Sequence, residues 1–176
     1  AETIKNHKPM SLAINLSGRH FGNAAMLEYI QQAIENYGAE PQSLKFEVNE
    51  TEAVENLSKA RSFIDALRSI GCKFALDDFG IGFSSFHYLR NLPVDYIKID
   101  GSFVRSLHVD EDDRLFVKAI VDLAKGLKIS CIAEFVENAH IIDVLLELGV
   151  DMGQGFAIAK PEPRFLDSHI VDMDNL

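Results

Sequence analysis

Polar side chains follow six short apolar runs in this chain, at the point where each run ends. They are Asn15, Glu47, the pair Asp77 and Asp78, Lys98 with Asp100, Glu134, and Gln154. In a parallel β/α protein the carboxyl ends of the strands converge on one face, so we expect these side chains to meet. Carboxylate and amide oxygens around one lysine are suited to hold divalent cations for phosphate chemistry.

The adjacent acids Asp77 and Asp78 form the sharpest of these motifs. Unpaired buried charge is costly, so the two carboxylates cannot both enter an apolar core. Neighbouring residues point to opposite sides of a strand, but at its end both can reach one site, where one would bridge two metals. Gly80 and Gly82 permit a tight loop beside them. The alternative interpretation is an acidic turn with glycine hinges.

Two pairs of glutamates share a spacing of three residues, Glu47 with Glu50 and Glu134 with Glu137. In each pair the first residue directly follows an apolar run and is the better candidate ligand. The second could accept hydrogen bonds from a neighbouring loop. For Glu50 and Glu52, a solvated loop position or a helix cap is an equally serious interpretation.

Lys98 stands inside an apolar strand, where a lysine needs a partner. Chemically it could hold a water molecule or neutralise charge that develops on a phosphate. Structurally it could simply pair with Asp100 or Asp77. Asn15 and Gln154 are neutral amides, able to ligate a cation or reach a ligand, or only to satisfy backbone groups.

The apolar runs alternate with segments of helical periodicity, which predicts a mostly parallel sheet in an α/β fold. The predicted helices are Ala24–Tyr37, Asn56–Ile70, Asp112–Leu127 and Ala139–Leu148, with a short one over Ser84–Leu89. A full (β/α)8 barrel needs roughly 250 residues, and this chain has 176. An open sheet and a barrel without one or two N-terminal strands both fit.

Length and composition predict one domain over residues 1–176, with 47% hydrophobic and 25% charged residues. A formal net charge of −10 argues against a DNA-binding surface, but not against a nucleotide bound through metal. Cys72 and Cys131 form no metal or disulfide motif, which favours a reducing compartment. No apolar stretch reaches membrane-spanning length. We therefore expect a cytoplasmic segment, whatever anchors a longer parent protein.

Several segments together resemble one family. The chain is similar, from about residue 10 to 166, to the EAL domain, the bacterial phosphodiesterase module that acts on cyclic di-GMP. The matching segments are Asn15–Ser17, Phe46–Glu50, Asp77–Ser85, Leu92–Asp100, Ala133–Glu137 and Gln154–Phe156.

This resemblance implies a (β/α)8 TIM-type barrel, here incomplete with about six of eight βα units, and two Mg²⁺ or Mn²⁺ ions. By motif position, Asn15, Glu47 and Asp77 correspond to ligands of one ion, with Asp77 bridging. Asp78 and Glu134 correspond to ligands around the second ion.

The resemblance also implies catalytic roles. Lys98 corresponds to a lysine that contacts the nucleophilic water, and Gln154 to a glutamine near it. Glu50 corresponds to the acid that holds the loop after Asp77-Asp78, and Glu137 to an acid that supports the ligands. The implied reaction is hydrolysis of one phosphodiester of cyclic di-GMP to give linear pGpG.

The chain also departs from the family pattern. No Glu-Ala-Leu segment occurs in it, so we expect two N-terminal strands, a ligand glutamate and a phosphate-contacting arginine to be missing. Beside the ligands, Asn49, Ile81, Phe83 and Phe135 replace the threonine, threonine, tyrosine and glycine of the family.

These departures leave rival functions open. One is a module that binds cyclic di-GMP or a protein partner without hydrolysis, and a more remote one is another metal-dependent phosphohydrolase. We expect the exposed sheet edges to favour a homodimer. We also expect the parent protein to carry fused sensor or GGDEF-type domains.

Overall fold

The computed structural model describes residues 11–82, 88–161 and 171–172. The chain divides into two compact units. The first contains the chain up to Asp77 together with Gly82–Asp95, and the second contains Asp78–Ile81 together with the chain from Tyr96 onward.

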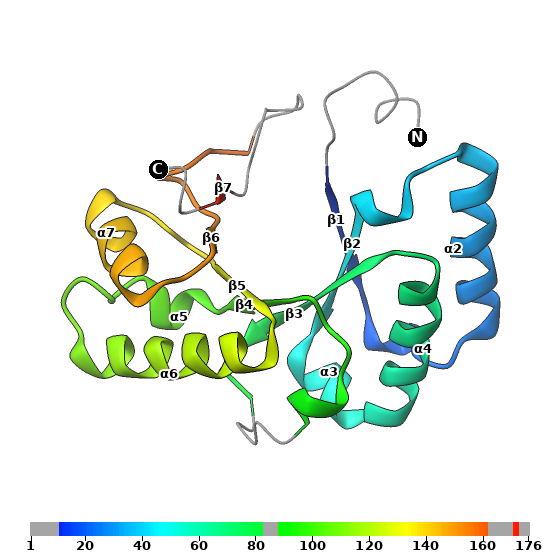
Figure 1. Cartoon of the computed structure of the whole chain (residues 1–176), viewed down its shortest axis with the longest axis horizontal. Helices are drawn as coiled ribbons and strands as arrows, with labels where there is room; N and C mark the ends of the chain where they lie inside the picture. Colours follow the sequence, from blue (N-terminus) through cyan, green and yellow to red (C-terminus); the bar gives the residue numbers. More distant parts are fainter. Residues whose placement is uncertain (1–10, 83–87, 162–170, 173–176) are drawn as a thin grey trace. The chain divides into compact units, whose positions relative to one another are not determined.

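The first unit is built on three parallel strands and the helices that follow them (Figure 1). The strands are β1 (Leu12–Leu16), β2 (Leu44–Asn49) and β3 (Lys73–Phe79), the last of which runs on into the second unit. The helices are α2 (Ala24–Tyr37), α3 (Glu50–Glu55) and α4 (Leu57–Ser69).

Local signals in the sequence set the limits of these helices. The side chain of Asn23 caps the start of α2 by accepting from the Met26 N–H, and Gly38 ends the helix in the left-handed conformation. Helix α4 buries Phe63, Ile64 and other apolar residues on one face. These contacts hold the helices beside the strands and leave the strand ends free for polar residues.

The second unit continues the parallel pattern with β4 (Tyr96–Ile99), β5 (Ser130–Ala133) and β6 (Met152–Gly153). A short strand, β7 (Val171–Asp172), pairs with β6 in the antiparallel direction. The helices of this unit are α5 (Gly101–Val104), α6 (Glu111–Leu127) and α7 (Ala139–Leu148). Helix α6 contacts both α5 and α7 (Figure 1).

The acidic turn before α6 works as its sequence predicts. Asp110 caps the helix by accepting from the Asp112 and Asp113 N–H groups, and three acids occupy the first turn. Negative charge there is stabilised by the positive end of the helix dipole.

The predicted long helices are confirmed, α2 and α7 residue for residue, α4 and α6 within one residue. The short helices α3 and α5 and strand β7 were not predicted. The predicted helix over Ser84–Leu89 lies mostly outside the described residues, and a 3-10 helix occupies Leu89–Asn91. Among the described helices, none is both long enough and apolar enough to cross a membrane.

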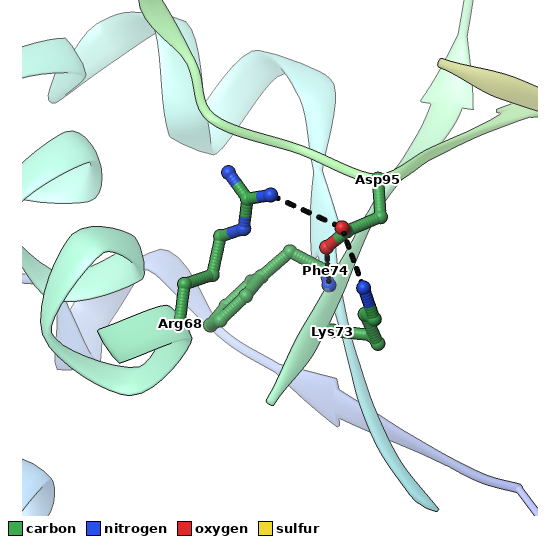
Figure 2. A network of polar contacts seen from close by, with 4 residues as sticks. All are labelled: Arg68, Lys73, Phe74 and Asp95. Atoms are coloured by element: carbon green, nitrogen blue, oxygen red, sulfur yellow. Dashed lines mark hydrogen bonds and ion pairs between the residues drawn. The ribbon is translucent and has the colours of Figure 1, made fainter. Parts of the chain in front are cut away.

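A charged network ties the start of β3 to the segment before β4 within the first unit (Figure 2). Asp95 Oδ1 lies 3.1 Å from Arg68 Nη2 and 3.2 Å from Lys73 Nζ. Its other oxygen, Oδ2, accepts from the Phe74 N–H at 2.9 Å. One carboxylate therefore meets two cations and a backbone donor, an arrangement suited to stability.

Candidate functional site

In the first unit, the strand register aligns the predicted polar residues. Asn15 lies opposite Glu47 in the β1–β2 pair, and Asn49 lies opposite Asp77 in the β2–β3 pair. Side chains alternate along a strand, so Asn15, Glu47 and Asp77 all project from the same side of the sheet. Glu47 is only 6% exposed, whereas Asn15 is exposed.

The backbone of Asp78 departs from ordinary strand geometry. Its φ is +54°, in the left-handed region that residues other than glycine rarely occupy. A regular strand would send Asp77 and Asp78 to opposite faces of the sheet. The left-handed turn at Asp78 breaks this alternation, and aspartate tolerates it better than most residues do.

In the second unit, Asp78 and Glu134 offer carboxylate oxygens within 4.8 Å of each other, and Asp77, bonded covalently to Asp78, completes a group of three acids. Glu134 directly follows β5, and its N–H donates to Ile99 O at 3.2 Å. Oxygen donors at this spacing match the ligand chemistry of Mg²⁺ and Mn²⁺. The donor set thus fits a divalent cation.

Lys98, in β4, is 4% exposed and contributes the positive charge of this cluster. Its Nζ lies 2.8 Å from Glu134 Oε1, an ion pair whose side chains are 5% and 13% exposed. The sequence correctly indicated that Lys98 needs a carboxylate partner. Glu134 is such a partner, and it was not among the acids, Asp100 and Asp77, that the structural alternative named. The Asp100 carboxylate caps α5 by accepting from the Ser102 N–H at 2.7 Å.

Gln154 follows β6, and its backbone extends the sheet toward Glu134. Its N–H donates to Ala133 O at 2.8 Å, and its carbonyl accepts from the Val136 N–H at 3.1 Å. A cavity of about 190 Å³ opens here. It is lined by Glu134, Phe135, Glu137, Gln154, Gly155 and Phe156.

Glu50 lies at the first position of α3 and is only 2% exposed. Asn49 caps that helix, accepting from the Thr51 and Glu52 N–H groups, so the asparagine keeps the capping chemistry of the threonine it replaces. The phenol of Tyr88 donates to Glu50 Oε1. A Cβ added to Gly82 would lie 3.4 Å from Glu50 Oε2. The Glu50 carboxylate thus lies close to both Gly82 and Tyr88.

Tyr88 was not predicted from the sequence as a site residue. Burial, together with the hydrogen bond and charge of Glu50, raises the pKa of its phenol far above the usual range. It is therefore a neutral donor at any physiological pH. A tyrosine nearly 40 positions from its partner carries no local signal.

The remaining acids have other surroundings. Glu52 accepts from the Gly18 N–H at 2.6 Å and ties α3 to the turn after β1. Glu137 is half-exposed, with its Oε1 3.8 Å from Arg105 Nε. Neither Glu52 nor Glu137 is in the group of three acids found among the described residues.

The two cysteines offer no nucleophile. Burial raises the pKa of the Cys72 thiol to about 11. Burial and the nearby Asp151 raise that of Cys131 to about 12. Both thiols are therefore protonated near neutral pH and behave as small apolar side chains.

Comparison with known proteins connects this geometry to a family. The family profile described as "EAL domain" matches residues 1–161. The cyclic di-GMP phosphodiesterase PdeB of Shewanella oneidensis is 45% identical over 152 residues, which are 86% of this chain and 18% of that protein. PdeF of Escherichia coli K12, also named a cyclic di-GMP phosphodiesterase, is 39% identical over 86% of this chain and 20% of its own length.

Solved structures show the same fold. The structure titled "PaMucR Phosphodiesterase, c-di-GMP complex" matches with a TM-score of 0.85 and 33% identity, covering 92% of this chain and 66% of that one. The FimX EAL domain of Pseudomonas aeruginosa bound to c-di-GMP matches with a TM-score of 0.81 and 28% identity, covering 86% and 62%. The predicted fold class, α/β with an incomplete TIM-type barrel, is confirmed.

The chain spans about a fifth of the length of the curated relatives it matches first.

Proposed function

The chain belongs to the EAL domain family, and from that membership we propose that its domain hydrolyses cyclic di-GMP to linear pGpG with bound Mg²⁺ or Mn²⁺. The proposed setting is bacterial second-messenger signalling. Relatives that are named cyclic di-GMP phosphodiesterases at 45% and 39% identity support the substrate.

One observation carries the proposal. Asp78 and Glu134 hold their carboxylates within 4.8 Å of each other, and Lys98 is paired with Glu134 at 2.8 Å. Asp77 completes this group of three acids. Converging carboxylates favour a divalent cation, which can activate water for phosphodiester hydrolysis.

We assign the metal ligands by motif position and by face of the sheet. Asn15, Glu47 and Asp77, which project from one side in the first unit, would hold one ion. Asp78 and Glu134 would hold the second. When bound, the ions would activate water and neutralise the charge that develops on the phosphate.

The other residues of the site would position and stabilise. The Lys98 ammonium, held by Glu134, would donate a hydrogen bond to the attacking water and keep its own proton. Gln154 would orient the same water from the rim of the cavity. Glu50 would fix the loop after Asp78 through its contacts with Tyr88 and Gly82, and Glu137 would support the ligands from outside.

The test is chromatography of cyclic di-GMP after incubation with the chain and Mn²⁺ or Mg²⁺. We expect pGpG to form, and to disappear when EDTA is added. The Asp77→Asn variant keeps the side-chain shape and removes one charge, so it should give no product.

Two results would count against hydrolysis. Turnover by Asp77→Asn equal to that of the wild type would remove Asp77 from the mechanism. Binding of cyclic di-GMP without any pGpG would instead support a module that senses the nucleotide.

We also propose that residues 1–176 form one EAL-type domain of a cytoplasmic segment, fused to sensor or GGDEF-type domains. The bifunctional diguanylate cyclase/cyclic di-GMP phosphodiesterase MucR, 34% identical over 89% of this chain, supports the fusion. We propose a homodimer as well, supported by the exposed Ile14 on β1. Sedimentation velocity at several protein concentrations would test it.

A further inference from the structure

Phe135, directly after the proposed ligand Glu134, occupies a position that favours glycine. Its φ is +53°, in the left-handed region, and its side chain is one of the large apolar ones that remain exposed, at 44%. A phenylalanine in this conformation is strained by about 1 kcal/mol or more. Such strain at an exposed ring beside the site points to a role for the ring.

The fold makes room for this ring at a second unusual position. Gly101 begins α5 and is buried. A Cβ added there would lie 2.1 Å from Phe135 Cδ2 and 2.6 Å from its Cγ, far inside contact distance. The glycine at 101 and the phenylalanine at 135 are therefore a matched pair.

Arg105 holds the ring from the same helix. The Arg105 backbone N–H donates to Gly101 O at 3.0 Å, so the two residues lie one turn apart and on one side of α5. The Arg105 guanidinium carbon is 4.1 Å from the Phe135 ring centroid. Arg105 Nε is also 3.8 Å from Glu137 Oε1. Gly101 and Arg105 thus both lie against the ring, which remains partly exposed.

The exposed ring also lines the cavity that contains proposed catalytic residues. Phe135 lines the cavity of about 190 Å³ together with Glu134 and Gln154. A second aromatic residue, Phe156, lies on its rim and is largely exposed. The cavity therefore joins flat apolar surfaces to the groups that would act on the phosphodiester.

We propose that Phe135 is a specificity-determining residue whose exposed ring stacks on one guanine base of the substrate. This inference rests on the proposed function, since it assumes a guanine dinucleotide at the site. Every base has a flat π-face, and aromatic side chains bind bases through it. The arginine behind the ring holds it in place by a cation–π contact. The phosphates, being anionic, would meet the cations and Lys98 instead.

The experiment compares three substitutions at one position. Phe135→Gly removes the ring and relieves the backbone strain, so it should fold at least as well as the wild type, which its melting temperature will show. Phe135→Leu keeps apolar bulk without a π-face, and Phe135→Tyr keeps the ring. The measurements are the Kd of pGpG by calorimetry with Mn²⁺, and KM and kcat for cyclic di-GMP.

For Phe135→Gly and Phe135→Leu we expect the Kd and KM to rise about tenfold, with kcat within about twofold of the wild type. Phe135→Tyr should match the wild type. Equal nucleotide affinity in the wild type and Phe135→Gly, or in the wild type and Phe135→Leu, would overturn the stacking role.

A substitution at Gly101 tests whether this glycine makes room for the Phe135 ring, and it leaves the phenylalanine itself unchanged. Gly101→Ala should displace the ring and raise the Kd to a similar extent. In the Phe135→Gly background the same substitution should have no effect, because there is no ring to displace. Additive effects of the two substitutions would contradict the inference.

The outcomes separate this inference from the proposed function. Suppose that the wild type binds the nucleotide without hydrolysing it and that Phe135→Gly binds it more weakly. The proposed hydrolysis is then wrong, and the stacking role of Phe135 is supported. If the wild type hydrolyses cyclic di-GMP and Phe135→Gly has the same Kd and KM, only the stacking role of Phe135 is wrong. A wild type that neither binds nor hydrolyses overturns both.

Discussion

Two charged clusters in this molecule use the same kinds of groups in opposite proportions. In the first unit, Asp95 meets Arg68, Lys73 and the Phe74 N–H, so one carboxylate faces two cations and a backbone donor (Figure 2). In the second, Lys98 is bound to Glu134, which lies with Asp78 in a group of three acids.

The difference separates stability from chemistry. Lys73 and Phe74 stand at the amino end of β3, whereas Asp77 and Asp78 stand near its carboxyl end. In β/α barrels the amino ends of the strands serve stability and the carboxyl ends carry the active site. In the Asp95 cluster one carboxylate is held by two cations and a backbone donor. In the cluster around Lys98 several carboxylates converge, an arrangement suited to a divalent cation.

The largest effect on activity should come from Asp78→Asn, which changes the acidic cluster and leaves the Asp95 cluster intact. Asparagine keeps the shape and tolerates the left-handed backbone, so the fold should survive. We expect the turnover of cyclic di-GMP to fall by about 100- to 1000-fold. The stability of the metal-free protein should be unchanged or higher, because a like charge has been removed.

Metal titration followed by thermal unfolding checks the cause. The melting temperature of the wild type should rise with Mn²⁺ or Mg²⁺, since a ligand that binds only the folded state stabilises it. Asp78→Asn should show a much smaller rise. A full metal-induced rise in Asp78→Asn would mean that this aspartate is not a ligand.

Lys98→Met should give the next largest effect, on stability in the absence of metal. It leaves the buried carboxylate of Glu134 beside Asp78 without its cation. Loss of one partner of a buried pair costs about 3 kcal/mol. Urea unfolding without metal should show this loss, and millimolar Mg²⁺ should recover part of it.

A matched double variant tests that interpretation. In Lys98→Met/Glu134→Gln both charges of the pair are gone, so the metal-free stability should return close to that of the wild type. If the double variant is as unstable as Lys98→Met, lost packing of the lysine stem is the cause instead.

Asp95→Ala should produce a smaller loss, confined to stability. It removes two ion pairs and leaves the Phe74 N–H without its acceptor, which costs about 2 kcal/mol. Asp95→Asn keeps the acceptor and should cost about half as much. The kcat of both variants should equal that of the wild type. A drop in kcat at full occupancy of the folded state would join this cluster to the chemistry and end the contrast.

The sequence predicted the long helices because their caps and apolar periods are local signals. In α2, for example, Asn23 caps the start of the helix and Gly38 ends it. Helix α3 was not predicted because it has only six residues and because its cap, Asn49, is also the last residue of a strand. The strand ends were also predicted from local signals, and the register of the structure then places Glu47 and Asp77 on one side of the sheet.

The contacts that organise the site could not be predicted in the same way. Lys98 was expected to need an acid, but the choice of Glu134 depends on the β4–β5 register, which pairs Lys98 with Ile132 and Ile99 with Ala133. The left-handed backbone of Asp78 and Phe135 has no signal in residue type, since neither is glycine. Such exceptions to local preference are most frequent at functional sites.

The smallest effect on stability is expected at a solvent-exposed ion pair in the first unit. Arg61 Nε and Asp65 Oδ2 lie 3.6 Å apart on α4, with both side chains more than half exposed. Water screens such a pair, so Asp65→Asn should change the free energy of unfolding by less than about 0.5 kcal/mol. The measurement is urea unfolding of Asp65→Asn and Asp95→Asn at low and high salt. The two variants can be compared because both substitutions remove one aspartate charge from the same unit. A loss at Asp65 as large as that at Asp95 would mean that net charge governs stability here. A difference in favour of Asp95 assigns its effect to the partners that converge on one partly buried carboxylate.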